Sequence, residues 1–183
     1  WQQELSEKFF LPCTILESKS YKEIARDTND YPFDTGDSII ICSYQFARNK
    51  ANDVESVAWD LVVIDEAHRL RNVYKSSNII ANTLKRILQN RHKLLLTATP
   101  LQNSLLELFG LVSFIDDRVF GDLNSFRTQF AKLDGEGVVT DLKERLKPIC
   151  HRTLRRQVTA YVPFTQRHAI CEEFTPSPDE ERL

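Results

Sequence analysis

The sequence predicts an α/β fold built on a parallel β-sheet, from two kinds of pattern. Apolar runs without alternation, typical of strands covered on both faces, fall at 38–42, 61–64 and 93–97, with a weaker run at 13–16. Within 75–90, apolar residues recur at helical spacing, which indicates an amphipathic helix that connects two parallel strands. Sheets of this kind bind ligands at the carboxyl ends of their strands, so functional side chains are expected directly after the apolar runs.

The second half of the chain has a helical pattern. Residues 104–115 are strongly apolar, enough for a helix buried on most sides, and Phe126, Phe130 and Leu133 continue at spacings of four and three. The remaining elements expected here are a loop at 134–137, a helix at 142–149 and a helix start at the capping box 177–180.

Composition limits the classes of function. The chain has 183 residues, 42% apolar and 27% charged, which suits one globular domain with a substantial core. Its 24 basic and 26 acidic residues give a formal charge of -2, so any contact with nucleic acid must be local. Four cysteines without a C-x-x-C pair suit a reducing cell interior, and nothing resembles a signal peptide or a membrane-spanning segment.

No complete nucleotide cradle is present. None of the five glycines precedes a lysine, so the G-x-x-x-x-G-K-[ST] phosphate loop is absent, and the G-x-G at 135–137 lacks the third glycine of a dinucleotide fingerprint. The chain also begins at Trp1 and contains no Met. We therefore expect a piece of a longer protein whose phosphate loop lies elsewhere.

The most specific chemical signal is the pair of carboxylates, Asp65 and Glu66, that follows the run 61–64. Asp65 is expected to hold Mg²⁺ through its water shell, and Glu66 to accept a proton from a water that attacks a terminal phosphate. The alternative is a plain helix start, because acidic residues favour a first helical turn. A second polar strand end, with Thr97 and Thr99 before Pro100, favours a functional site.

Several ordered segments together resemble the Swi/Snf family of ATP-dependent DNA translocases, within helicase superfamily two. The sequence Asp-Glu-Ala-His at 65–68 with its basic continuation at 69–72 resembles motif II of that family. Residues 96–103 resemble motif III, residues 1–5 motif Ia, and Ser43-Tyr44 is placed like motif Ib. The resemblance extends over almost the whole chain.

The resemblance implies a RecA-like sheet of the P-loop NTPase type, with helices on both faces and a helical protrusion. Residues 1–103 would be a partial first ATPase lobe that lacks the phosphate loop. Residues 104–150 would be the protrusion, and residues 151–183 a connector towards the second lobe. Ala98 stands where many members have Gly, and 164–167 departs from a common Pro-Lys, which favours a divergent, bacterial subgroup.

The resemblance also implies roles for single residues. His68 would link motif II to motif III, and the coupling between ATP and nucleic acid would involve Thr97, Ala98, Thr99, Gln102 and Asn103. The nucleic-acid contacts would come from Trp1, Ser43, Tyr44, Arg155 and Arg156. Packing is the alternative for the two aromatic residues, and a solvated helix face for the arginines.

The predicted function is therefore that of a motor that hydrolyses ATP, with Mg²⁺, to move along duplex DNA without sequence specificity, together with a second lobe of the same chain. An RNA helicase of the DEAH or DEAD type and a non-catalytic scaffold are the alternatives. A zinc site at Cys150, His151, His168 and Cys171 is rejected, because the spacing fits no common zinc motif. An intracellular location is expected: the cytoplasm or nucleoid of a bacterium, or the nucleus of a eukaryote.

Overall fold

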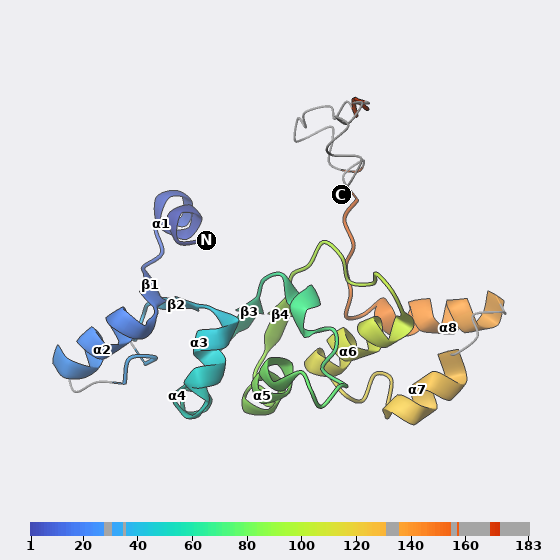
Figure 1. The fold of residues 1–183 in the computed structure, drawn as a ribbon, viewed down its shortest axis with the longest axis horizontal. Coiled ribbons are helices and arrows are strands. Elements are labelled where there is room, and N and C mark those ends of the chain that lie inside the picture. Colours follow the sequence, from blue (N-terminus) through green and yellow to red (C-terminus); the bar gives the residue numbers. More distant parts are fainter. Residues whose placement is uncertain (28–30, 35, 131–135, 155–156, 158–168, 173–183) are drawn as a thin grey trace, which may run out of the picture. The chain divides into compact units, whose positions relative to one another are not determined.

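The computed structural model describes residues 1–27, 31–34, 36–130, 136–154, 157 and 169–172 (Figure 1). The chain divides into two compact units, 1–145 and 146–183, and all the strands and nearly all the helices described below belong to the first. None of the helices in the described ranges is both long enough and apolar enough to cross a membrane.

Four short strands form two parallel pairs. Strand β1 (Cys13–Leu16) pairs with β2 (Ile39–Cys42), and β3 (Val62–Ile64) pairs with β4 (Lys93–Leu95). The four predicted strands are confirmed, but the last one ends at Leu95 instead of Thr97. Its polar end leaves the ladder because the Thr97 hydroxyl accepts a hydrogen bond from the backbone N–H of Thr99 (3.2 Å), which turns the chain.

Helices cover one face of these strands. The helices α3 (Tyr44–Asn49), α4 (Ala51–Ser56) and α5 (Ile79–Ile87) pack together and against that face. Helix α5 is shorter than the predicted 75–90, because the side chain of Asn78 caps it by accepting from the N–H of Ala81. The buried core under the strands includes Leu16, Phe46, Ala47, Val54, Ile64, Ala81, Leu84, Ile87 and Leu88.

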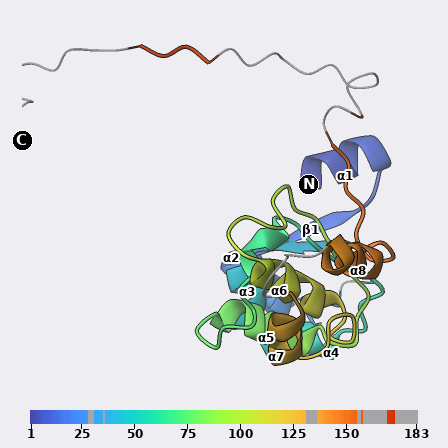
Figure 2. The same ribbon diagram turned by 90° about the vertical axis from the view of Figure 1, so that its right-hand side faces the viewer.

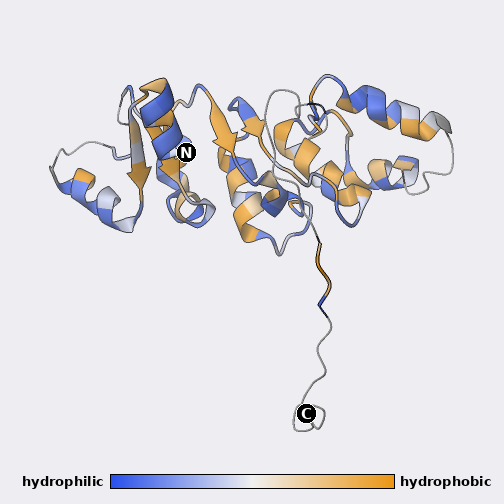
Figure 3. Ribbon diagram, turned by 90° about the horizontal axis from the view of Figure 1, so that it is seen from above, coloured by the Kyte–Doolittle hydropathy of each residue, from blue (hydrophilic) through white to orange (hydrophobic). Residues whose placement is uncertain are grey.

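The opposite face of the strands is apolar and exposed in the described part of the chain. Strand residues alternate between the two faces, so the neighbours of buried Ile64 and Leu16 point the other way. Ile15 is 43% exposed, and Val63 and Leu94 are each 47% exposed. Figure 3 shows that the strands are predominantly hydrophobic. The sequence predicts that both faces of the strands are covered. In the described part of the chain, helices cover one of them.

Four of the described helices lie outside the predicted elements: α3 and α4, given above, and two nearer the N-terminus. Helix α1 (Gln2–Phe9) contacts the start of β1, and its last turn ends at Phe10, which has a left-handed backbone (φ 55°). Helix α2 (Ser18–Asp27) also packs against β1. Both are amphipathic or polar segments without the long apolar repeats on which the sequence prediction relied.

The C-terminal part of the first unit is helical, as predicted. Helix α6 (Leu105–Ile115) packs against α7 (Leu123–Phe130), and α8 (Glu136–Leu146) follows (Figures 1 and 2). The rings of Phe109, Phe120, Phe126 and Phe130 form a second small core, with centroid separations of 4.9–6.0 Å. This aromatic cluster accounts for the predicted spacing of four residues along α7.

The predicted loop at 134–137 is wrong for residues 136 and 137, which are helical. The helix predicted at 142–149 begins at residue 136 and ends at residue 146. Helix α8 starts at Glu136 and includes Gly137, since one glycine costs a helix only about 1 kcal/mol. It ends at Leu146, before Pro148. The capping box 177–180 lies outside the described residues.

Gly110 lets two segments of the first unit approach closely. A methyl group at this position would overlap the backbone carbonyl oxygen of Arg71 and lie 2.8 Å from its carbonyl carbon. Arg71 follows the short 3₁₀ helix η1 (Ala67–Leu70), which α6 also contacts. Glycine is thus the residue that allows α6 to lie against the chain after β3.

We expect Gly110→Ala to lower the free energy of unfolding by about 3 kcal/mol, because the overlap is with backbone atoms that cannot rotate away. The matched control is Gly137→Ala, where nothing lies within 4 Å of the added methyl. That change should stabilise helix α8 slightly. Urea unfolding of both variants checks this, and equal stability of the two would contradict the close approach.

Candidate functional site

The carboxyl ends of β3 and β4 lie side by side, as the sequence predicts. The N–H of Leu96 donates to the carbonyl of Ile64 (2.9 Å), and the N–H of Ala67 donates to the carbonyl of Leu96 (2.9 Å). We call residues 65–71 the β3 turn and residues 97–103 the β4 loop. These two segments contain eight of the predicted site residues, which the structure thus brings to one edge of the strands.

Asp65 is the first residue of the β3 turn, and both of its carboxylate oxygens accept hydrogen bonds. Oδ1 accepts from the backbone N–H of Glu66 (2.8 Å), and Oδ2 accepts from the indole N–H of Trp1 (2.6 Å). The structure thus places Trp1, an expected nucleic-acid contact, against the carboxylate of Asp65. A carboxylate has about four acceptor positions, so two remain for other donors or a cation.

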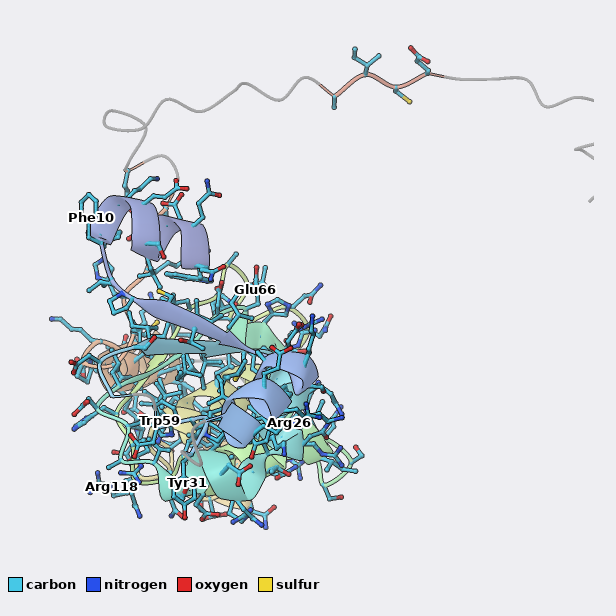
Figure 4. The ribbon with its side chains drawn as sticks, turned by 90° about the vertical axis from the view of Figure 1, so that its left-hand side faces the viewer. Phe10, Arg26, Tyr31, Trp59, Glu66 and Arg118 are labelled. Atoms are coloured by element: carbon cyan, nitrogen blue, oxygen red, sulfur yellow. The ribbon has the colours of Figure 1, made fainter. Side chains whose placement is uncertain are left out.

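Glu66 has a left-handed backbone, with φ 49° and ψ 42°. This conformation costs a residue with a side chain on the order of 1 kcal/mol, and such strain is concentrated at functional sites. The side chain of Glu66 is 61% exposed and lies at the surface (Figure 4). The carboxylate is therefore free to meet a ligand from solvent.

His68 lies close to Glu66. Its Nδ1 is 3.2 Å from Oε2 of Glu66, yet this buried nitrogen makes no hydrogen bond with any described atom. The Glu66 carboxylate is the acceptor nearest to this nitrogen among the contacts described here. The structure thus brings together the predicted trio Asp65, Glu66 and His68.

Ser43 and Tyr44 have structural partners at the end of β2. The Ser43 hydroxyl caps α3 by accepting from the N–H of Phe46 (3.2 Å). The hydroxyl of Tyr44 donates to the backbone carbonyl of Asp65, which joins α3 to the β3 turn. Burial and then the charge of Asp65 raise the pKa of Tyr44 to about 12, so its phenol stays protonated. Their predicted contact with nucleic acid stays a prediction.

A buried carboxylate, Glu107, lies behind the β4 loop. Its Oε2 accepts from the backbone N–H groups of Gln102 (3.0 Å) and Asn103 (3.1 Å). Its Oε1 accepts from Nδ2 of Asn103 (3.0 Å) and lies 3.3 Å from Nε of Arg71. Nη1 of Arg71 also donates to Oε1 of Gln102 (2.8 Å). Glu107 and Arg71 thereby join the β4 loop to the β3 turn.

The ionised form of Glu107 is favoured. Burial, the largest single influence, raises the pKa of this carboxyl, but the hydrogen bonds from Asn103 and Gln102 and the charge of Arg71 together outweigh burial. The pKa of Glu107 therefore lies below its ordinary value of 4.5.

Sequence reasoning missed Glu107 and did not single out Arg71. Glu107 is the one charged residue in the apolar segment 105–115, and only 4% of it is exposed. A lone charge inside such a segment requires a partner, and that requirement was the available signal. The partners could not be read from the sequence, because Arg71 is 36 positions away.

Of the remaining predicted residues, some are exposed and others lie outside the described part of the chain. Ala98 and Thr99 are exposed at the start of the β4 loop. Arg155, Arg156 and His168 lie outside the described residues. Within the described ranges no three His, Cys, Asp or Glu side chains form a group that could hold a metal ion.

The donor chemistry of Asp65 nonetheless fits the predicted Mg²⁺. This ion is usually bound by one or two carboxylates together with waters and phosphate oxygens, so a single exposed carboxylate with unused acceptor positions suffices on the protein side.

Known proteins resemble this chain over almost its full length. A family model described as SNF2-related domain matches residues 1–178. The uncharacterized ATP-dependent helicase YqhH of Bacillus subtilis (strain 168) is 33% identical over 189 aligned positions, which cover 100% of this chain and 30% of that protein. Chromodomain-helicase-DNA-binding protein 8 of Danio rerio is 34% identical over 145 positions, which cover 79% of this chain and 6% of that protein.

A solved structure has a similar fold. It is described as the Sulfolobus solfataricus SWI2/SNF2 ATPase core in complex with dsDNA, and it matches with a TM-score of 0.60 and 22% identity. The match covers 81% of this chain and 30% of that one, and it confirms the predicted RecA-like fold class. The chain spans at most 30% of the length of each of these relatives.

The lowered pKa of Glu107 predicts a pH-dependent contribution to stability. The folded-state pKa is below the ordinary 4.5, so the contribution is complete above about pH 4.5 and is lost as the pH falls through the folded-state pKa. The difference in unfolding free energy between wild type and Glu107→Gln should therefore shrink as the pH is lowered below that point. Urea unfolding at a series of pH values measures it, and a difference that grows in acid would contradict the assignment.

Proposed function

The chain belongs to the SNF2-related domain family, and from this premise we propose that it is part of the motor of an ATP-dependent DNA translocase. Such a helicase-like hydrolase uses ATP to move along duplex DNA or to remodel protein–DNA complexes. The observation that carries the proposal is the edge where β3 and β4 end, with Asp65, Glu66 and His68 in the β3 turn beside the β4 loop.

In the proposed reaction Glu66 is the general base. Its exposed carboxylate accepts a proton from a water whose oxygen forms the new bond to the terminal phosphorus of ATP. The bond from that phosphorus to the bridging oxygen breaks, and ADP and phosphate leave. His68, whose Nδ1 lies 3.2 Å from Glu66, is proposed to orient the carboxylate. As the family resemblance implies, it would also link the β3 turn to the β4 loop.

Asp65 is the proposed Mg²⁺ residue. When bound, Mg²⁺ would offset the negative charge of the phosphates. The indole of Trp1 and the backbone N–H of Glu66 hold the Asp65 carboxylate at the strand end, and the Tyr44 hydroxyl holds its backbone carbonyl. These contacts fix the orientation of the carboxylate before any ligand arrives.

The segment 65–68 reads Asp-Glu-Ala-His, and we assign it as a DEAH-type motif II. The β4 loop, with Thr97, Ala98, Thr99, Gln102 and Asn103, is proposed to couple the ATP site to DNA. Its hydrogen bonds to the β3 turn support this role. A scaffold without turnover is less well supported, because the carboxylate pair is present.

The proposed partners are duplex DNA and a second ATPase lobe of the same longer protein. The similar solved structure is of an ATPase core in complex with dsDNA, which favours DNA over the RNA bound by DEAH or DEAD helicases. With a formal charge of -2, contacts would be local and would involve phosphates, including Arg155 and Arg156 as proposed donors. An intracellular location with access to DNA, in a nucleus or a nucleoid, follows from this proposal.

The general base is tested by Glu66→Gln in the full-length protein. The amide keeps the shape but accepts no proton, so kcat for ATP hydrolysis should fall by about 100-fold or more while ATP affinity changes by less than about threefold. Glu55→Gln is the control, because Glu55 makes an exposed ion pair with Arg86 (3.0 Å) on other helices. Wild-type turnover in Glu66→Gln would place the base elsewhere.

The polymer is tested by stimulation of ATPase activity. Duplex DNA should raise kcat of the full-length protein several-fold more than duplex RNA of the same length, because the motor is proposed to follow the backbone of DNA. Both polymers carry one phosphate per nucleotide, so their charge is matched. Greater stimulation by RNA would favour the helicase alternative.

A further inference from the structure

Glu107 is the most deeply buried charged side chain among the described residues, and the proposed chemistry does not use it. It is 4% exposed, and it is the one charged residue of helix α6. A carboxylate in such surroundings costs several kcal/mol of desolvation unless its oxygens are fully hydrogen-bonded. We therefore expect each carboxylate oxygen of Glu107 to have hydrogen-bond donors around it.

The four groups around Glu107 are all donors. Oε2 accepts two backbone N–H groups, from Gln102 and Asn103, while Oε1 accepts the side-chain amide of Asn103 and faces Nε of Arg71. A neutral glutamine would have to turn an NH₂ group, a donor, towards two of these donors. The site therefore selects an acceptor-only side chain with a negative charge.

Glu107 binds the end of the β4 loop, and the start of that loop is bound separately. The N–H groups of Gln102 and Asn103 belong to its last two residues, whereas Leu96, directly before the loop, bonds Ile64 and Ala67. Arg71 at the end of the β3 turn contacts both Glu107 and Gln102. Both ends of the β4 loop are thus fastened to the two ends of the β3 turn.

The position of α6 relative to the β3 turn is itself constrained. Gly110, one turn after Glu107 on α6, lies directly against the backbone carbonyl of Arg71. The ion pair and the close backbone approach therefore act on the same side of the helix, three residues apart. The packing of α6 at Gly110 therefore holds the backbone of α6 close to that of Arg71, on the side where Glu107 lies.

From this arrangement we infer that Glu107 is a positioning residue: it fixes the β4 loop against the β3 turn, so that changes at the ATP site are transmitted to the DNA-facing loop. The inference rests on the proposed function for its coupling role. The fastening of the loop follows from the hydrogen bonds alone and is measurable without activity.

The test is Glu107→Gln in the full-length protein, with ATP hydrolysis measured without DNA and with saturating duplex DNA. The ratio of stimulated to basal kcat should fall about tenfold, while KM for ATP changes less than about twofold. Amide hydrogen exchange at residues 97–103 should rise about tenfold, because glutamine replaces one acceptor oxygen of Glu107 with a donor and so weakens the attachment of the loop. Glu55→Gln, the same change in an exposed ion pair, should alter neither quantity.

Arg71→Lys and Asn103→Ala extend the test if Glu107→Gln does not fold. Lysine keeps the charge of Arg71 but not the planar fork that reaches both Glu107 and Gln102. Asn103→Ala removes one of the four donors from an exposed loop residue. Each should lower the stimulation ratio and raise loop exchange, by less than Glu107→Gln.

The possible outcomes separate the two proposals. Wild-type protein without DNA-stimulated ATPase activity contradicts the proposed function, and loop exchange then decides the fastening role. Equal losses of basal and stimulated kcat, with an unchanged ratio, would show that Glu107 only supports the fold and would overturn the inference. Unchanged exchange at residues 97–103 in a folded Glu107→Gln protein would overturn it as well.

Discussion

The parallel pairing of β3 with β4 is the interaction on which the rest of the site depends. Ile64 aligns with Leu95, so both strands end at the same edge, and the ladder continues through Leu96 to the N–H of Ala67. Parallel strands cannot be joined by a tight turn, and α5 provides the crossover between them. A carboxylate pair and a hydroxyl-bearing loop, about 30 positions apart in the sequence, thereby become neighbours.

Helix α6 adds a second attachment that the strands alone do not provide. On its side towards η1, α6 has Gly110 where the two backbones touch and Glu107 where the hydrogen-bond donors lie. No other residue of the helix is charged. An apolar contact would bury the same area but would leave the N–H groups of Gln102 and Asn103 without acceptors. The buried charge is thus a consequence of bringing an irregular loop against a packed helix.

Much of the fold was predictable because its signals are local. Runs such as Val62–Ile64 and the period of Ile80, Leu84 and Ile87 indicate element type directly, and Asp65 and Glu66 follow a strand wherever that strand lies. Helices α1 to α4 and the true start of α8 were missed, because short or polar amphipathic segments lack a strong repeat. The Glu107–Arg71 contact was not predictable, because it depends on the packing angle of α6, which Gly110 permits.

A loop fastened at both ends responds to its supports as a unit. A movement of the β3 turn on ligand binding at Glu66 would displace both ends of the β4 loop in the same direction. Ala67 is hydrogen-bonded to Leu96 at one end, and Arg71 is hydrogen-bonded to Gln102 at the other. A loop fastened only at Leu96 would absorb that shift in the flexible dihedral angles of residues 97–103. Transmission therefore requires the second attachment, and the strain in the left-handed backbone of Glu66 lies at the point where such a movement would begin.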